Sequence, residues 1–391
     1  MKVYADNAAT TRCGESALKA MLPFFREDFG NPSSLHAYGQ SAATALQKAR
    51  ESVARSLGAL PQEIYFTGSG SEADNQAIRS AAFNGAKKGK KHLITCAIEH
   101  HAVLHTLNQL AREGFEVTVL PVDEYGIVTP EQVAEAIRED TALVTIMTAN
   151  NEVGTIEPIS EIARVCKDKR VTFHTDAVQA IGHIPMDVKT LGADMLSLSG
   201  HKFHGPKGVG VLWARRGVPL QSLINGGAQE RMRRAGTENI PGIVGLAVAL
   251  EEAVAELNEV APRLSALRDK LIRGLEPIEL SRLNGHPTKR LPGNVNFCFE
   301  GIEGESLLLL LDQKGVCASS GSACTSGSLD PSHVLLALGL PHAIAHGSLR
   351  LSFSRETTEA DVEHILSVVP PIVEYLRNIS PVWEEITKAQ A

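Results

Sequence analysis

Residues 193–202 read ADMLSLSGHK, and this stretch decides how the rest of the chain is interpreted. A β-prone apolar run, 195–198, ends in a Ser-Gly pair and leads directly to Lys202. Similar β-rich runs recur between residues 60 and 215, with helical stretches between several of them. Strands that alternate with helices predict an α/β domain with a mainly parallel sheet. The seven candidate strands are residues 64–67, 93–96, 117–120, 143–147, 171–174, 195–198 and 209–213.

Polar side chains follow several of these strands directly. Asn150 and Asn151 come after one strand, Asp176 after another, and Lys202 after a third. Ligands of such sheets bind outside the carboxyl ends of the strands, so we expect these side chains to converge there.

Lys202 and Asp176 together indicate a cofactor. A lysine that can form a Schiff base and an aspartate that can pair with a pyridinium nitrogen are what pyridoxal phosphate (PLP) requires of a protein. Gln179 could donate a hydrogen bond to the ring oxygen. Two alternatives stay open: Lys202, like Lys207, could be a surface lysine, and Asp176 could cap a helix after its strand.

Residues 68–73, GSGSEA, follow a candidate strand and open a helix. This pattern matches a dinucleotide fingerprint, which also needs an acidic residue about 20 positions on, after the next strand. The chain has a lysine-rich segment there, and the first acid after the strand is Glu99. A helix N-terminus binds a single phosphate equally well, so we favour a phosphate site of PLP.

Histidines near the predicted site have two interpretations. His100 or His101 could stack on the cofactor ring, and histidine also moves protons near neutral pH. Alternatively, His101 with His105, or His342 with His346, could form metal-binding pairs at helical spacing. Neither pair has the glutamate of an H-E-x-x-H motif, so we do not expect a metal.

Arg350 and Cys324 complete the set of candidate site residues. An arginine in an apolar strand needs an anionic partner, because an unpaired buried guanidinium is costly. That partner could be the carboxylate of an amino-acid substrate or an internal Asp or Glu. Cys324 lies among Ser, Gly, Ala and Thr and could be an incidental loop cysteine, but accessible thiolates are nucleophiles. Beside a PLP site, such a thiol favours sulfur transfer.

Composition limits the broad class. The 391 residues, 43% hydrophobic and 21% charged, are enough for two packed domains. A net charge of -7 gives no general reason to bind nucleic acid or an anionic membrane surface. No apolar run reaches the roughly 20 residues of a membrane helix, and no signal segment opens the chain. None of the six cysteines forms a CxxC pair. We expect a cytoplasmic protein.

The character of the sequence changes near residue 240. One long helical tract, 244–275, precedes strands near 295–299 and 349–352 and a closing helix over 359–376. We expect a large domain over residues 15–260 and a smaller α+β domain made of 1–14 and 261–391, which carries the Cys324 loop.

Nine segments in order, spread over nearly the whole chain, resemble the group I cysteine desulfurases, most closely the NifS branch. They are residues 4–11, 29–36, 70–75, 99–103, 150–154, 174–179, 199–208, 234–239 and 319–328. The chain departs from that pattern at Ala73, where many relatives carry Ser, and at His101, where others carry Pro or Lys.

The resemblance implies the aspartate-aminotransferase-like fold of PLP enzymes, transferase fold type I, with a mainly parallel seven-stranded sheet, in a homodimer. It assigns Lys202 to the Schiff base, Asp176 to the pyridine nitrogen and Gln179 to the ring oxygen. It assigns His100 to stacking on the ring.

The resemblance also places residues around the phosphate and the substrate. Those near the phosphate are Gly70, Ser71, Ser199 and His201. Thr237 would reach the phosphate of the other subunit's cofactor. Asn151, also near the ring, and Arg350 would hold the substrate carboxylate.

The implied reaction converts L-cysteine to L-alanine and leaves a persulfide on Cys324, with His100 as a proton shuttle. An iron–sulfur scaffold protein would then receive the sulfur. Selenocysteine lyase and aminotransferase activities are alternatives on the same fold, and a non-catalytic scaffold for sulfur assembly is a third.

Overall fold

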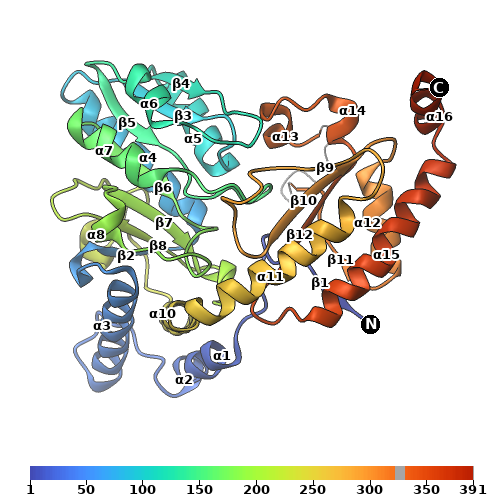
Figure 1. The fold of residues 1–391 in the computed structure, drawn as a ribbon. Coiled ribbons are helices and arrows are strands. Elements are labelled where there is room, and N and C mark those ends of the chain that lie inside the picture. The colour runs from blue at the N-terminus through green and yellow to red at the C-terminus, as the bar shows by residue number, and fades with distance from the viewer. Residues whose placement is uncertain (322–330, 391) are drawn as a thin grey trace.

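The computed structural model describes residues 1–321 and 331–390 (Figure 1). Its centre is a seven-stranded sheet, in which β8 runs antiparallel to both of its neighbours and the other adjacent strands pair in parallel. The mainly parallel seven-stranded sheet expected from the sequence is therefore confirmed. In spatial order the strands are β2 (Ile64–Thr67), β8 (Gly210–Ala214), β7 (Met195–Ser199), β6 (Thr172–Asp176), β5 (Thr141–Thr145), β3 (His92–Cys96) and β4 (Glu116–Leu120).

Helices cover both faces of this sheet, because successive residues of its strands point to opposite faces. In β7, Met195 packs toward one apolar cluster and Leu196 toward the other. The first face is covered by α4 (Gly70–Ala86) and α5 (His101–Arg112). Helices on the second face include α3 (Ala37–Leu57), α6 (Pro130–Ala136), α7 (Ile159–Asp168), α8 (Val188–Leu191) and α10 (Ile240–Ala255). Short helices complete this part of the chain: α1 (Glu15–Met21), α2 (Pro23–Arg26), α9 (Gln229–Met232) and the 3-10 turns η1 (Pro61–Glu63) and η2 (Gly200–Lys202).

A second, smaller sheet lies to the right in Figure 1. It is antiparallel, in the order β12 (Ser348–Ser352), β10 (Asn294–Phe299) and β9 (Ser281–Leu283). The N-terminal strand β1 (Val3–Tyr4) pairs in parallel with β11 (Val316–Cys317) beside it. The helices of this part are α11 (Leu257–Leu275), α12 (Gly304–Gln313), α13 (His333–Ala337), α14 (His342–Ala345), α15 (Glu359–Asn378) and α16 (Pro381–Gln390).

The tract expected to form one helix over 244–275 is instead two helices, α10 and α11, which meet at Glu256. The reason is packing, since α10 buries Ile243 and Leu246 in the core of the large sheet. By contrast, α11 buries Leu267 and Leu271 in the core of the small sheet. One straight helix could not face both cores.

Strand β10 has one face toward each part of the molecule. Val295, Phe297 and Phe299 pack into the core of the small sheet. On the other face, Asn296 donates a hydrogen bond to the carbonyl of Glu152, 3.1 Å away. The apolar and polar residues of one strand thus join the small core to a loop of the large sheet.

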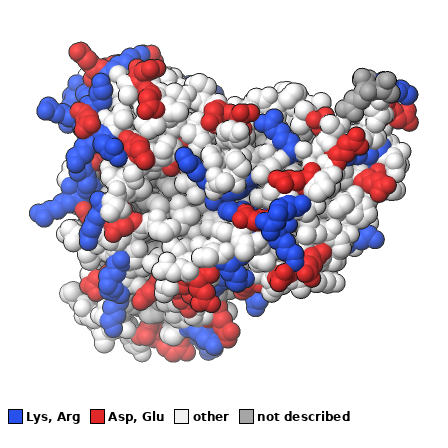
Figure 2. All heavy atoms as spheres, viewed as in Figure 1, with Lys and Arg blue, Asp and Glu red and all other residues white. Residues whose placement is uncertain are grey.

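Acidic and basic side chains are interspersed over the face shown in Figure 2. None of the helices in the described part of the chain has both the length and the apolar character needed to cross a membrane.

A buried ion pair stabilises the segment that follows β8. The guanidinium group of Arg50 in α3 donates two hydrogen bonds, of 2.8 and 2.6 Å, to the carboxylate of Glu230. Glu230, Arg231 and Met232 all have left-handed backbone conformations, with φ of 46°, 56° and 62°. Such conformations are costly for these residue types, so the ion pair helps to hold an otherwise unfavourable turn.

We expect Arg50→Met to destabilise the protein by about 3 kcal/mol, because it leaves the Glu230 carboxylate buried without its cation. Arg55→Met on the exposed side of the same helix should change the free energy of unfolding by less than about 0.5 kcal/mol. Urea unfolding of the three proteins checks this. Equal stability of the two variants would contradict it.

Candidate active site

A cavity of about 260 Å³ lies at the carboxyl ends of the central strands. Residues from both parts of the molecule line it. The large sheet and its helices contribute Ser69, Gly70, Ser71, Asp74, His100, His101, Met147, Asn151, Glu152, Asp176, Val178, Gln179, Ser199, His201 and Lys202; the N-terminal and C-terminal segments contribute Ala8, Ala9, Gly321, His333 and Arg350.

Lys202 enters the cavity from the turn η2, directly after β7. Its Nζ donates hydrogen bonds to the carbonyls of Ala8 and Ala9, at 2.7 and 2.8 Å. The chain then folds back so closely that a Cβ at Gly205 would lie 2.7 Å from the Gly200 carbonyl oxygen. The absence of a side chain at Gly205 thus permits the tight turn that follows Lys202.

Asp176 is the last residue of β6, and it is buried. Burial raises its pKa to about 6, although the amide of Val178, 2.8 Å from Oδ1, and the charge of Lys202 oppose that rise. The residues that follow Asp176 form turns, so Asp176 does not cap a helix.

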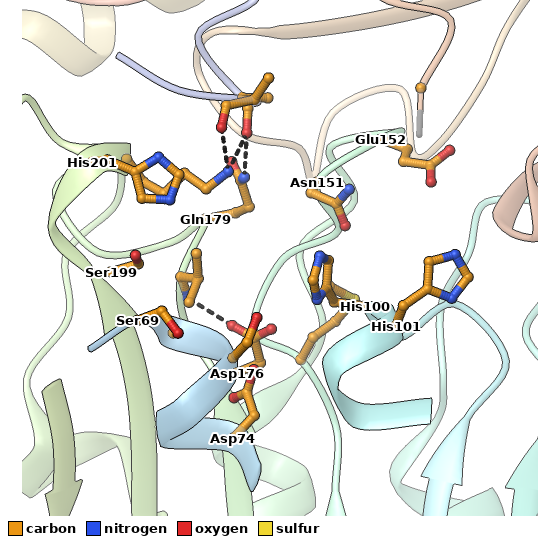
Figure 3. Close-up of a pocket in the computed structure, with 18 of the residues that line it drawn as sticks. Ser69, Asp74, His100, His101, Asn151, Glu152, Asp176, Gln179, Ser199 and His201 are labelled. Atoms are coloured by element: carbon orange, nitrogen blue, oxygen red, sulfur yellow. Dashed lines mark hydrogen bonds between the residues drawn. The ribbon is translucent and has the colours of Figure 1, made fainter. Parts of the chain in front are cut away.

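A second buried acid, Asp74 of α4, lies beside Asp176 (Figure 3). Burial and the neighbouring Asp176 raise the pKa of Asp74 well above its usual value. The nearby His174 ring, 3.6 Å from Asp74 Oδ1, is neutral because burial lowers its pKa to about 3. Because Asp176 has an amide donor and Lys202 to stabilise its charge, we assign the negative charge of the pair to Asp176.

The N-terminus of α4 forms another end of the cavity. Ser69 caps this helix, and its hydroxyl oxygen accepts a hydrogen bond of 3.1 Å from the amide of Glu72. A Cβ at Gly70 would lie 2.7 Å from the Val178 side chain and 3.3 Å from that of Ser199. Gly70 therefore lets the helix end come close to the strand ends, with its first amides available to an anion.

His201 and Gln179 border the cavity near the N-terminal segment. His201 Nδ1 lies 3.1 Å from the Thr10 hydroxyl, and burial together with Lys202 lowers the pKa of His201 to about 4. Gln179 donates a hydrogen bond of 2.9 Å to the Ala8 carbonyl.

His100 caps α5, since its Nδ1 accepts a hydrogen bond of 3.1 Å from the amide of Ala102. Burial and the charge of Lys202 lower the pKa of His100 to about 4. The ring is therefore neutral near pH 7, with its orientation set by the helix start.

His101, next to His100 in the cavity lining, packs against two other histidines. Its ring centroid lies 4.9 Å from that of His105 and 4.6 Å from that of His333. The rings of His101 and His105 are nearly parallel, at 25°, so they stack rather than point at a common ion. Both ring nitrogens of His101 are buried without a protein partner. In residues 1–321 and 331–390, no group of three or more His, Cys, Asp or Glu side chains is arranged to hold a metal ion.

Arg350 has an internal partner, one of the two alternatives left open by the sequence. Its Nη2 donates a hydrogen bond of 2.9 Å to Asp6, and its Nη1 donates one of 3.1 Å to the carbonyl of Asn151. Its Nε is buried without a protein partner. Arg350 still borders the cavity, where Asn151 also lies.

One expected site residue lies elsewhere in the described part of the chain, and one falls outside that part. Thr237 is exposed and does not line the cavity of its own chain. Cys324 lies outside the described residues; Gly321, three positions before it, lines the cavity.

Sequence reasoning missed the buried acids Asp74, Glu99 and Glu152. For Asp74 the helical periodicity carried a signal, because Gly70, Ala73, Ala77 and Ile78 on the same face are buried as well. No comparable pattern marked the other two.

Glu99 connects two strands beneath the cavity. One carboxyl oxygen accepts hydrogen bonds from the amide of Met147 and the thiol of Cys96, at 2.6 and 3.2 Å. Burial and the nearby Asp176 raise its pKa to about 8. The folded protein thus keeps a proton on Glu99 that the unfolded chain releases above pH 4.5.

Because of this proton, the free energy of unfolding falls as the pH rises from about 5 to 8, since the unfolded chain releases the proton at lower pH than the folded protein does. Over this pH range we expect the unfolding free energy of Glu99→Gln to fall by roughly 2–4 kcal/mol less than that of the wild type, because glutamine does not ionise. Urea unfolding at pH 5.5 and 8 measures the difference, with Glu131→Gln on the surface as control. A pH dependence equal to that of the wild type would show that Glu99 does not titrate in this range.

Comparisons with known proteins agree on one family. A family model described as aminotransferase class-V matches residues 3–365. A cysteine desulfurase IscS of Methanosarcina thermophila is 59% identical, over 97% of this chain and 94% of that protein. A cysteine desulfurase NifS of Azotobacter vinelandii is 51% identical, over 97% of this chain and 95% of that protein.

Solved structures agree as well. A NifS-like protein of 42% sequence identity superposes with a TM-score of 0.91, covering 96% of this chain and 100% of its own. The chain belongs to the class-V aminotransferase family and, within it, to the cysteine desulfurases of the IscS and NifS kind.

Proposed function

We propose that this enzyme uses PLP to take sulfur from L-cysteine, that it releases L-alanine, and that the sulfur is first held on Cys324. The observation that carries the proposal is the meeting of Lys202 with the buried carboxylate of Asp176 in one cavity at the strand ends. One solved relative of 38% identity, titled "SspA in complex with cysteine", supports the choice of substrate.

The residues around the cavity fit PLP in three respects. The first turn of α4, with Gly70 and Ser71, suits a phosphate; Ser199 lies beside Gly70, and His201 also lines the cavity. The buried charge of Asp176 needs a cationic partner, which a protonated pyridine nitrogen would provide. Lys202 comes from a turn that directs its amine into the same space.

PLP, when bound, draws electrons from the substrate Cα and so makes the loss of its proton easier. We propose that Lys202 removes and returns protons at Cα, and that Asp176 keeps a proton on the ring nitrogen. His100 offers a neutral ring for stacking and, from the same place, can exchange protons with the substrate. Gln179 would reach the ring oxygen by exchanging its contact with Ala8.

Asn151 and Arg350 would hold the substrate carboxylate. Arg350 Nε is buried and unpartnered, and its fork is at present shared between Asp6 and the Asn151 carbonyl. If part of the guanidinium group turned to the substrate, both the buried Nε and the substrate carboxylate would gain a hydrogen-bond partner.

Sulfur transfer needs a nucleophile, and we assign this role to Cys324. The Cys324 thiolate attacks the substrate sulfur, the C–S bond breaks, and protonation of the carbon product gives alanine. The net change is L-cysteine plus thiol to L-alanine plus persulfide. We propose that an iron–sulfur scaffold protein then takes the sulfur.

We also propose a homodimer in which Thr237 completes the partner's phosphate site. Support comes from the exposure of Thr237, and from large apolar side chains on the same segment and on the N-terminal region. These include Met232, Phe29 and Leu35, which are 69%, 63% and 93% exposed.

The division into domains at residue 260 remains a proposal. The two apolar cores support it, since Val3 and Ala5 belong to the core of α11 and α15. Leu335 and Leu338, however, pack into the core of the large sheet, so the C-terminal part also contributes to that core.

We expect Cys324→Ala to keep the yellow colour of bound PLP and to lower single-turnover alanine release by at least about 100-fold, since the nucleophile is missing. Lys202→Ala should lose both the Schiff-base absorbance and the turnover. Cys317→Ala is the matched control, a half-buried thiol seven positions earlier that should turn over normally. Normal turnover by Cys324→Ala would instead favour a lyase of the selenocysteine type, and colourless protein without turnover would favour a scaffold.

For the homodimer, we expect a solution mass twice the 41.9 kDa of one chain, measured by light scattering. Thr237→Val should weaken PLP binding about tenfold through the loss of one hydrogen bond to a charged group. Fluorescence titration with PLP checks the affinity. A monomer that binds PLP as tightly as a dimer would contradict the shared site.

A further inference from the structure

Glu152 is a buried acid that the mechanism above does not use. It directly follows Asn151 in the turn beyond β5, and only 2% of its surface is exposed. One of its carboxyl oxygens, Oε2, accepts a hydrogen bond from the hydroxyl of Ser332. A Cβ added to Gly321 would lie 2.7 Å from the same oxygen, so the carboxyl group lies directly against Gly321.

In the sequence, Gly321 precedes and Ser332 follows segment 322–330, which contains Cys324. Gly321 follows a short pairing of Ser319 with Arg350, in which each amide donates to the other carbonyl. Ser332 caps α13, where its hydroxyl oxygen accepts from the amides of Val334 and Leu335. One oxygen of Glu152 thus contacts both ends of the segment, which are otherwise anchored to different elements.

The turn that carries Glu152 is itself firmly held. Within it, Asn150 Oδ1 accepts hydrogen bonds of 2.8 and 2.9 Å from the amides of Glu152 and Val153. From outside, three successive carbonyls accept side-chain hydrogen bonds. The Asn151 carbonyl accepts from Arg350, the Glu152 carbonyl from Asn296 and the Val153 carbonyl from Arg290, at 3.1, 3.1 and 3.0 Å.

The backbone of Gly321 adds a second constraint. Its φ of 126° lies where side chains are rarely tolerated, and its close approach to the carboxyl group leaves no room for one. The contact is therefore specific to glycine on one side and to a hydroxyl donor on the other.

We propose that Glu152 is a positioning residue that ties Gly321 to Ser332, the described residues before and after segment 322–330, and thereby supports sulfur transfer to Cys324. The consequence for catalysis rests on the proposed function, in which Cys324 receives the sulfur. The anchoring itself rests only on the contacts of Glu152 with Gly321 and Ser332.

The test compares Glu152→Ala, Glu152→Gln and, as matched control, Glu131→Ala on the exposed side of α6, all as PLP-loaded enzymes. Hydrogen–deuterium exchange of peptides covering 316–321 and 331–337 reports the anchoring without any need for activity. We expect exchange there to rise at least about fivefold in Glu152→Ala and to stay near wild type in Glu152→Gln, which still accepts the Ser332 hydroxyl.

Kinetics add a second readout. In Glu152→Ala we expect kcat for alanine release to fall about tenfold while the spectral response to L-cysteine binding keeps its midpoint. Adding Ser332→Ala to Glu152→Ala should not raise exchange at 316–321 further, because the two groups act through one contact.

Unchanged exchange in Glu152→Ala would overturn the proposal, as would equal loosening by the Glu131→Ala control. If exchange rises but kcat does not fall, the ends are tied without any effect on Cys324, which also overturns it. Failure of the proposed function would be seen in a different variant. Cys324→Ala would then turn over normally, whatever the hydrogen–deuterium exchange of Glu152→Ala.

Discussion

Keeping one negative charge at Asp176, away from water, is the constraint on which the site depends. A buried carboxylate is stable only with donors and cations around it, and its like-charged neighbours must then give up their own charge. Glu99 does so by holding a proton, since its pKa is raised to about 8, and burial beside Asp176 raises the pKa of Asp74 as well. His174 contributes no charge, because burial keeps its ring neutral. Lys202 is a cation close to this carboxylate. The buried charge of Asp176 suits the cavity to a cofactor with a positively charged ring nitrogen, and the first turn of α4 suits it to an anionic phosphate.

The second requirement is that distant parts of the chain meet accurately at the strand ends. The carbonyls of Ala8 and Ala9 orient the Lys202 amine, although more than 190 residues separate them. The turn of Asn151 and Glu152 is held in part by side chains of the small sheet, Arg350 and Asn296. These contacts are hydrogen bonds to backbone carbonyls, and they fix the positions of the segments that meet at the site.

Two features would mislead when taken alone. The glycine-rich start of α4 matches a dinucleotide fingerprint, yet its geometry is that of a helix end brought close to Val178 and Ser199 by Gly70. Arg350 looks like a ready clamp for a substrate carboxylate, but its guanidinium group already contacts Asp6 and the Asn151 carbonyl, so a substrate could engage only part of it. In both cases the local pattern describes what a residue can bind, and only its neighbours decide what it does bind.

The sequence by itself determined the alternation of strands and helices, the seven strands of the large sheet and the placement of Asp176 and Lys202 at strand ends. These features depend on local periodicity and on the residue types that end a strand. It did not reveal the break at Glu256 or the internal partner of Arg350, which lies 344 positions away. Nor did it reveal the raised pKa of Asp74 or the contact of Glu152 with both Gly321 and Ser332. Only the tertiary structure decided these, because pairing and protonation depend on burial and on charges that come together only after the chain has folded.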